Sequence, residues 1–128
     1  MALVGLGIDL VDVDEAERLL ERWGDRLLRR LLTDAEREYV LRFERPAQYL
    51  AVRLAAKEAV YKALQSFPGA RDVRWRHIEV LRRHDGAPSI RLHDEAARLC
   101  EAAGNFRVSL SLTHTRRTAG AVALIERD

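Results

Sequence analysis

Cysteine, lysine and long apolar runs are all scarce in this sequence of 128 residues. Cys100 is the only cysteine, which excludes an intrachain disulfide and a metal site built from several thiolates. The most apolar stretches, residues 1–13 and 108–125, are interrupted by polar or charged side chains, and neither supplies the roughly 20 apolar residues of a membrane span. The first residues also lack the basic segment and the small-residue cleavage site of a signal peptide. We therefore expect a soluble, cytoplasmic protein with no membrane partner.

The composition is that of one ordinary domain covering residues 1–128. Hydrophobic residues make up 48% of the chain, which is enough to build a core. The 22 basic and 20 acidic residues leave a formal net charge of only +2, so the charge balance gives little support to a polyanionic partner. Trp23 and Trp75 are not interleaved with a basic patch in any recognisable binding motif. We expect no nucleic-acid partner.

The first half of the chain predicts one strand followed by helices. Residues 3–11 indicate a buried strand in which Gly5 and Gly7 permit the close approach of another backbone. A helical pattern over residues 14–32 is broken or bent near Gly24. Thr33 and Glu36 have the spacing of a capping box that opens the next helix, through about residue 42. Proline at position 46 suits the start of a long helix that ends before residue 68.

The second half is dominated by strand patterns. Residues 77–83 and 87–93 alternate as strands around a turn, and residues 94–103 form a short amphipathic helix. Residues 106–115 and 118–126 predict a final hairpin. This order of elements predicts an α+β fold in which the long helix packs on a largely antiparallel sheet.

The segment "RLAAKEAVYK", residues 53–62, contains both lysines of the chain, while every other basic residue is arginine. Glu58 and Lys62 are four residues apart and point away from the small residues of the helix, so they could form an exposed ion pair worth a few tenths of a kcal/mol. Arg53 and Lys57 are also one turn apart. Because like charges at this spacing repel, we expect these two side chains to face an anion rather than each other.

Asp9 is a carboxylate near the end of an otherwise apolar strand, where burial is costly unless it is paired or bound to a cation. If Asp9 and Glu58 meet, their oxygens and those of a phosphate would suit Mg²⁺. His114 ends a strand next to a turn, where a ligand could reach it, although a structural role is the alternative. Ser111 and Thr113 lie on the face of that strand opposite His114. The other histidines, at positions 77, 84 and 93, have no neighbours in the sequence that indicate a site.

Three segments in this order, "GIDLVDVDEAER", "RLAAKEAVYKAL" and "SLTHTRRTAGAVALIE", closely resemble the acyl-carrier-protein synthase family of 4′-phosphopantetheinyl transferases. The resemblance runs from about residue 4 to residue 126, and the second segment is the most specific. It implies Mg²⁺-dependent transfer of the 4′-phosphopantetheine arm of coenzyme A to a serine of an apo acyl carrier protein, with release of adenosine 3′,5′-bisphosphate. It also implies the α+β transferase fold and a homotrimer with active sites between subunits.

The resemblance implies a role for each matching residue. Asp9 and Glu58 would be the magnesium ligands, and the pyrophosphate of coenzyme A and water would complete the coordination shell. Lys62, Lys57 and Arg53 would engage the phosphates. The strand segment would contribute His114 to the phosphates, with Ser111 and Thr113 lining the same site. The proton of the attacking serine would go to a metal-bound water or to a carboxylate, and the sequence leaves both open.

One departure from the family bears on the carrier protein. Where the family commonly has an arginine that contacts the acidic carrier, this chain has Glu15. Arg18 and Arg22 are the candidate carrier contacts that could compensate, and a solvated basic face is the alternative. The stripe would be longer if the helix continues through the glycine at position 24, and it would then include Arg18, Arg22, Arg26 and Arg29. The substitution leaves a competing hypothesis, a noncatalytic module of the same fold that binds coenzyme A or a carrier protein.

Overall fold

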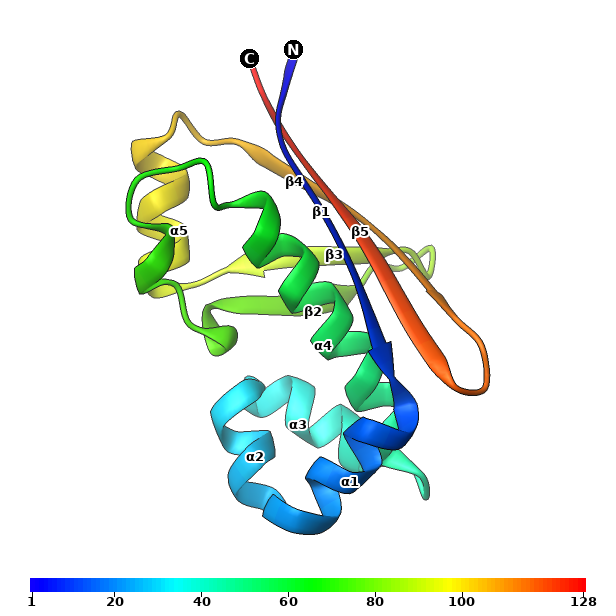
Figure 1. Cartoon of the computed structure of the whole chain (residues 1–128). Coiled ribbons are helices and arrows are strands. Elements are labelled where there is room, and N and C mark those ends of the chain that lie inside the picture. Colours follow the sequence, from blue (N-terminus) through cyan, green and yellow to red (C-terminus); the bar gives the residue numbers. More distant parts are fainter.

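The computed structural model describes all 128 residues and contains two antiparallel sheets. The larger sheet has the strand order β1-β5-β4, and the smaller sheet pairs β2 with β3. The strands are β1 (Ala2–Asp12), β2 (Ile78–Arg82), β3 (Pro88–Leu92), β4 (Arg107–His114) and β5 (Thr118–Arg127). In Figure 1 both termini lie at one end of the larger sheet, because Ala2 pairs with Arg127. The predicted α+β fold with antiparallel strands is confirmed.

Five α-helices surround these sheets. They are α1 (Val13–Trp23), α2 (Asp25–Leu31), α3 (Asp34–Leu41), α4 (Pro46–Ala63) and α5 (Asp94–Ala102). The predicted break falls at Gly24, where φ is 56° and α1 ends, and the predicted capping box of Thr33 and Glu36 opens α3. Two 3₁₀ turns, η1 (Ala70–Asp72) and η2 (Trp75–His77), were not predicted. None of the helices combines the length and the apolar character needed to cross a bilayer.

Helix α4 lies directly on β1 because two glycines leave room for its backbone (Figure 1). A Cβ added at Gly7 would lie 1.8 Å from the carbonyl oxygen of Ala59, and one at Gly5 would lie 2.3 Å from that of Ala63. The alanines that α4 presents to the sheet are buried. This contact sets the register between α4 and β1, and it brings Asp9, two residues beyond Gly7, beside the part of α4 that carries Glu58.

The two faces of the larger sheet differ in what they contact. The inner face packs on α4, and the register places Asp9 on this face in line with Ala121 of β5. The outer face carries Leu6, Ile8 and Leu10, which are 61%, 62% and 71% exposed. An apolar row on one side of a sheet is therefore left uncovered by the chain itself.

Candidate active site

Asp9, Glu58 and Lys62 come together where β1 runs past α4. The Nζ atom of Lys62 lies 3.1 Å from Oδ1 of Asp9 and donates a hydrogen bond to the carbonyl oxygen of Ile8 at 3.0 Å. Asp9 and Glu58 line one hollow of 450 Å³. The cation of Lys62 thus pairs across to the strand, and the simpler expectation of an ion pair within the helix is not met.

The electrostatics of this hollow centre on the Glu58 carboxyl. Burial raises the pKa of Glu58 above its usual range, the negative charge of Asp9 raises it further, and the ammonium of Lys62 opposes both effects. Two neighbouring carboxylates that disfavour each other's ionisation create a place where an added cation is stabilised. The site is therefore electrostatically incomplete with Lys62 as its only cation.

The donor set suits a magnesium ion. No group of three or more His, Cys, Asp or Glu side chains is arranged to hold a metal, so Asp9 and Glu58 are the candidate ligands and most of a coordination shell would have to come from outside the chain. Mg²⁺ is commonly bound by one or two carboxylates, with water and substrate phosphates supplying the other oxygens. Hard oxygen ligands and an incomplete protein shell fit that pattern.

The remaining wall of the carboxylate hollow is mostly apolar. Leu19, Leu54 and Trp75 contribute to it, together with the carboxylate of Glu15. Trp75 belongs to η2, which lies far from α4 in the sequence, and no local pattern marks it as part of the site. Glu15 had been predicted only to affect the carrier, and the structure places it in the same wall as the metal-ligand candidates.

A second hollow, of 260 Å³, contains Arg53, Arg82 and His114. The Arg53 guanidinium lies over the Tyr39 ring, 4.3 Å from its centroid, and its buried Nε atom has no hydrogen-bond partner. The Nδ1 atom of His114 lies 2.9 Å from the side-chain amide nitrogen of Gln48. Because that amide nitrogen can only donate, Nδ1 accepts and the proton of a neutral His114 lies on Nε2. The hollow therefore concentrates donors and positive charge, and sequence reasoning missed Arg82 and Gln48 in it.

No residue lines both hollows. Glu58 and Arg53 lie on different sides of α4, so a single chain separates its carboxylates from this second group of phosphate-binding candidates. Within one copy, the predicted site residues therefore form two clusters.

Lys57 belongs to neither hollow. It faces an anion, as expected, but that anion is the carboxylate of Glu36, and the implied contact with phosphates is not what the structure of this chain shows. Its side chain is fully buried, and its ammonium donates to Oε1 of Glu36 at 2.7 Å, to the Trp75 carbonyl oxygen at 2.9 Å and to the Ile78 carbonyl oxygen. These three acceptors use the three protons of the ammonium. Burial lowers the pKa of Lys57, and the charge of Glu36 opposes that effect.

Ser111 and Thr113 do not share a hollow with His114. In the register of the sheet, Ser111 pairs with Val122 and Ile8 pairs with the same residue, so the two hydroxyls lie on the same outer face as the exposed apolar row, with β5 between them. The alternation of side chains along β4 had predicted that Ser111 and Thr113 lie on the face opposite His114. Ser111 and Thr113 therefore line neither hollow of a single copy.

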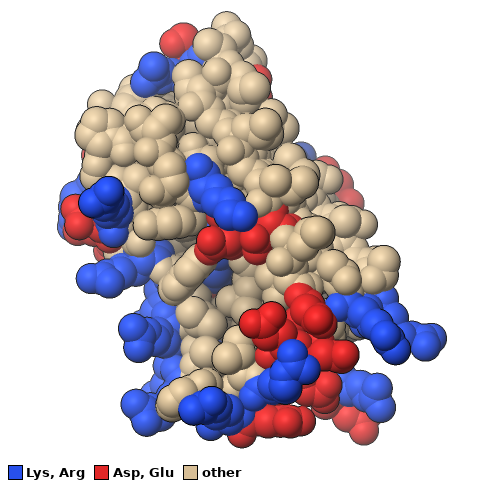
Figure 2. Space-filling model, in the orientation of Figure 1, with Lys and Arg blue, Asp and Glu red and all other residues tan.

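The arginine stripe on the N-terminal helices is shorter than the longest version predicted. Arg18 and Arg22 are exposed on α1, one turn apart, but the break at Gly24 places Arg26 and Arg29 on a separate helix. Figure 2 shows that charged side chains gather over the lower part of the molecule, where α1 to α3 lie, and that the two signs are mixed there. This surface is not a basic patch.

Comparison with known proteins gives one consistent result. A family model described as the 4′-phosphopantetheinyl transferase superfamily matches residues 5–119. A holo-[acyl-carrier-protein] synthase of Serratia proteamaculans is 42% identical over 127 residues, which are 98% of this chain and 99% of that protein. The crystal structure of the synthase from Neisseria meningitidis superposes with a TM-score of 0.88 at 29% identity, covering 98% of this chain and 100% of that one. The CoA complex of the Chronobacterium ammoniagenes enzyme gives a TM-score of 0.85 at 30% identity, covering 100% and 99%.

Proposed function

Because this chain belongs to the holo-[acyl-carrier-protein] synthases of the 4′-phosphopantetheinyl transferase superfamily, we propose that it transfers the 4′-phosphopantetheine group of coenzyme A to a serine of an apo acyl carrier protein. The second product is adenosine 3′,5′-bisphosphate. The observation that carries the proposal is the meeting of Asp9 and Glu58 in one hollow, with Lys62 paired to Asp9. The serine oxygen must attack a phosphorus surrounded by negative charge, so the reaction needs charge neutralisation and alignment, and this cluster can provide both.

Asp9 and Glu58 would hold the Mg²⁺ ion, with oxygens of the coenzyme A pyrophosphate and of water. The ion would neutralise charge on the pyrophosphate and make the phosphorus more electrophilic. Lys62 is 48% exposed at its side chain and remains within reach of both the strand and the hollow. Its compact ammonium can follow a phosphate oxygen as charge moves during transfer, which suits lysine better than the planar fork of arginine.

Arg53 and His114 would bind other phosphate oxygens of coenzyme A in the second hollow. The buried guanidinium of Arg53 has an unpartnered Nε, and His114 directs Nε2 away from Gln48. A phosphate in the hollow would accept from His114 and from the part of the Arg53 guanidinium that lines it. Burial lowers the pKa of the Arg53 guanidinium, and a nearby anion would act in the opposite direction.

We further propose that the protein is a homotrimer in which the carboxylate hollow of one copy faces the second hollow of the next. The exposed row of Leu6, Ile8 and Leu10 is the surface that a second copy would cover. Its position on the sheet beside Asp9, together with the separation of the two hollows in one chain, supports an active site shared between copies. Ser111 and Thr113, on the same outer face, would then line the shared site.

The transfer is tested by incubating the protein with Mg²⁺, coenzyme A and an apo carrier protein, and by weighing the carrier in a mass spectrometer. We expect the mass of the phosphopantetheine group to be added, and we expect Asp9→Ala and Glu58→Ala to abolish the addition. Glu101→Ala, on the exposed side of α5, is the control and should leave transfer intact. No added mass with any of several carrier proteins would overturn the proposal.

A noncatalytic module that binds coenzyme A is the second candidate, and one observation favours it. Glu15 adds a third negative charge to the wall of the carboxylate hollow, where it would repel an acidic carrier protein. This candidate predicts binding of coenzyme A, measured by calorimetry, without transfer. Turnover with any cellular carrier protein eliminates it.

A further inference from the structure

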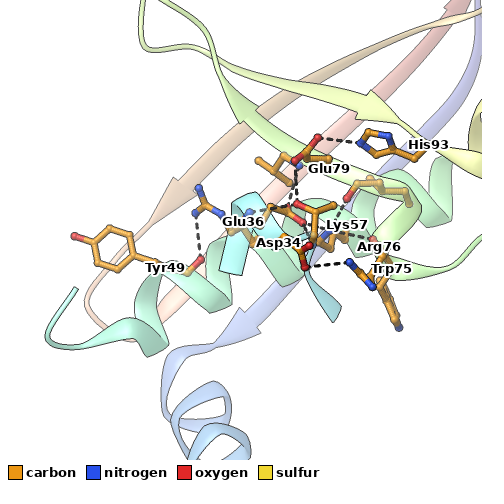
Figure 3. A network of polar contacts seen from close by, with 12 residues as sticks. Asp34, Glu36, Tyr49, Lys57, Trp75, Arg76, Glu79 and His93 are labelled. Atoms are coloured by element: carbon orange, nitrogen blue, oxygen red, sulfur yellow. Dashed lines mark hydrogen bonds and ion pairs between the residues drawn. The ribbon is translucent and has the colours of Figure 1, made fainter. Parts of the chain in front are cut away.

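A buried ion pair lies behind the helix that carries Glu58. Lys57 is 0% exposed and Glu36 is 2% exposed, and Nζ of the lysine lies 2.7 Å from Oε1 of the glutamate. Figure 3 shows the pair at the centre of a polar network that reaches outward to Glu79 and His93. Thr33 donates to Glu79 at 2.9 Å, and Glu79 lies 2.9 Å from the ring of His93, which the sequence had left without a partner.

The pair connects four elements, α3, α4, η2 and β2. Lys57, from α4, donates to the carbonyl oxygens of Trp75 in η2 and Ile78 at the start of β2. Glu36, from α3, accepts from the backbone N–H of Thr33 at 2.9 Å and from that of Val80 in β2 at 3.0 Å. Removal of either charged group would leave several buried polar atoms without partners.

Two of these contacts hold residues that form walls of the candidate site. Trp75 lines the carboxylate hollow with Glu58, and Val80 lines the second hollow with Arg53. The ion pair therefore fixes η2 and β2 against α4 on the side away from the larger sheet. The distance between these walls and the side chains of α4 depends on Glu36 and Lys57, although neither side chain reaches a hollow.

A buried ion pair is a poor way to stabilise a core, because desolvation of the two charges offsets most of their attraction. An apolar pair of similar volume would serve packing equally well. What an apolar pair cannot do is bind backbone carbonyl and N–H groups of η2 and β2 in one fixed arrangement. The directionality of the contacts therefore distinguishes this pair from ordinary core residues.

We propose that Glu36 and Lys57 are positioning residues, which set the walls of both hollows relative to Glu58 and Arg53. The catalytic part of this proposal rests on the proposed transfer reaction, because the expected defect is a poorer alignment of the groups that react in that transfer. Misplacement by about 1 Å can lower an enzymatic rate roughly 100-fold. We expect Lys57→Met to lower kcat by roughly 10- to 100-fold.

The test combines Lys57→Met with Glu36→Gln and their double variant. Lys57→Met leaves a buried carboxylate without its lysine. The double variant removes both charges, and the glutamine amide can donate to a freed carbonyl, although the backbone N–H of Thr33 or of Val80 then loses its acceptor. We expect the double variant to recover at least part of the kcat lost in Lys57→Met. If Lys57 instead contacted a substrate phosphate, the losses of kcat in Lys57→Met and in Glu36→Gln would multiply in the double variant. The KM for coenzyme A would also rise in Lys57→Met and in the double variant. Either result would overturn the proposal.

A variant in the core distinguishes a specific loss of kcat from the effect of lower stability alone. Leu99→Ala, in α5, removes a buried side chain that lines neither hollow. All variants are assayed at a temperature where circular dichroism shows full folding. A kcat for Lys57→Met no lower than that of Leu99→Ala would mean that the pair only stabilises the fold.

A fluorescence measurement tests whether the ion pair positions Trp75, and it does not depend on the transfer reaction. In a Trp23→Phe background, Trp75 is the only tryptophan, and its ring lies 6.0 Å from that of Tyr61. We expect the emission of Trp75 to shift to longer wavelength in Lys57→Met, to return toward the original in the double variant, and to stay unchanged in Leu99→Ala. An unshifted spectrum in folded Lys57→Met would overturn the proposal even in an active enzyme, and a shifted one would support it even if the transfer proposal fails.

Discussion

In the sequence, Glu58 fits two roles, the partner of Lys62 in a helical ion pair and a carboxylate of a binding site. Four residues separate it from Lys62, which is the spacing of an ordinary helical ion pair. In the folded chain the lysine pairs with Asp9 of β1, and Glu58 is left in a partly buried hollow facing that second carboxylate. The chemistry that follows is set by the strand, since the helix alone would have neutralised Glu58.

This arrangement predicts the direction in which neighbouring substitutions move the pKa of Glu58. Asp9→Asn removes a negative charge that raises it, so the pKa should fall toward its usual range while the contribution of burial remains. Lys62→Gln removes the opposing positive charge, so the pKa should rise further. A ¹³C NMR titration of the side-chain carboxyl groups of glutamate and aspartate measures both shifts.

Asp25 provides the internal control for that titration. Hydrogen bonds from Arg37 and Arg29 lower its pKa to about 2, and it lies on α2, away from the carboxylate hollow. Neither substitution should change it. A rise of the Glu58 pKa in Asp9→Asn would show that the two carboxylates do not interact as described.

At the scale of elements, the contact of α4 with β1 determines whether the site exists at all. Gly7→Ala would bring a Cβ to 1.8 Å from the Ala59 carbonyl oxygen, which is a backbone atom that cannot rotate away. The helix would have to move off the strand that holds Asp9. We expect a loss of about 3 kcal/mol or more in the free energy of unfolding, together with loss of transfer, measured by urea denaturation and by the carrier assay.

Gly69→Ala is the matched control for this substitution. Gly69 has φ of 87°, and nothing lies within 4 Å of an added Cβ, so alanine there should cost only backbone strain, about 1 kcal/mol. If the two alanine variants were equally stable, the close approach of α4 to β1 would not be what requires glycine at position 7.

Local signals in the sequence were sufficient for most of the fold. The capping box at Thr33, the proline that opens α4 and the alternation in the late strands each depend on a few neighbouring residues. Lys57 was misplaced for a nonlocal reason. The small residues of α4 were taken to mark its one covered side, but η2, β2 and α3 cover a further side and bury the lysine among their polar groups. Glu36 carried only its capping signal.

The site was predicted in the same uneven way. Asp9, Glu58 and Lys62 were named from residue chemistry and from family resemblance, but sequence spacing could not establish that they meet. Arg82 and Trp75 were not found, because each reaches its hollow through the pairing and packing of distant segments. The catalytic roles of the named residues stay predictions until variants are assayed.

At the scale of the whole molecule, the exposed row on β1 and the separation of the two hollows have one common explanation. An uncovered apolar strand face invites association, and closed rings of identical subunits are a usual result. If a neighbouring copy covers this face, it can also bring its own Arg53 hollow toward Asp9. Assembly would then be a requirement of catalysis.

Ile8→Glu tests the assembly. Ile8 is 62% exposed and lines neither hollow, so the substitution places a charge on the outer face without touching the candidate catalytic groups. We expect monomers in analytical ultracentrifugation, a native circular dichroism spectrum and loss of transfer. Leu41→Glu, at an exposed leucine of α3, is the control and should leave both assembly and transfer intact.

Mixing two inactive variants tests whether one active site draws residues from two copies. Glu58→Gln disables the carboxylate hollow and Arg53→Gln disables the second hollow, so each homogeneous protein should be inactive. When the two are unfolded together and refolded at equal amounts, about one quarter of the interfaces in a random trimer should pair an intact hollow of each kind. Transfer should therefore reappear at roughly that share of the wild-type rate.

Adding Ile8→Glu to both variants should remove the recovery, because it prevents the interface. If the mixture stays inactive although mixed trimers are detected by native mass spectrometry, the two hollows work within a single chain, and the shared site is wrong.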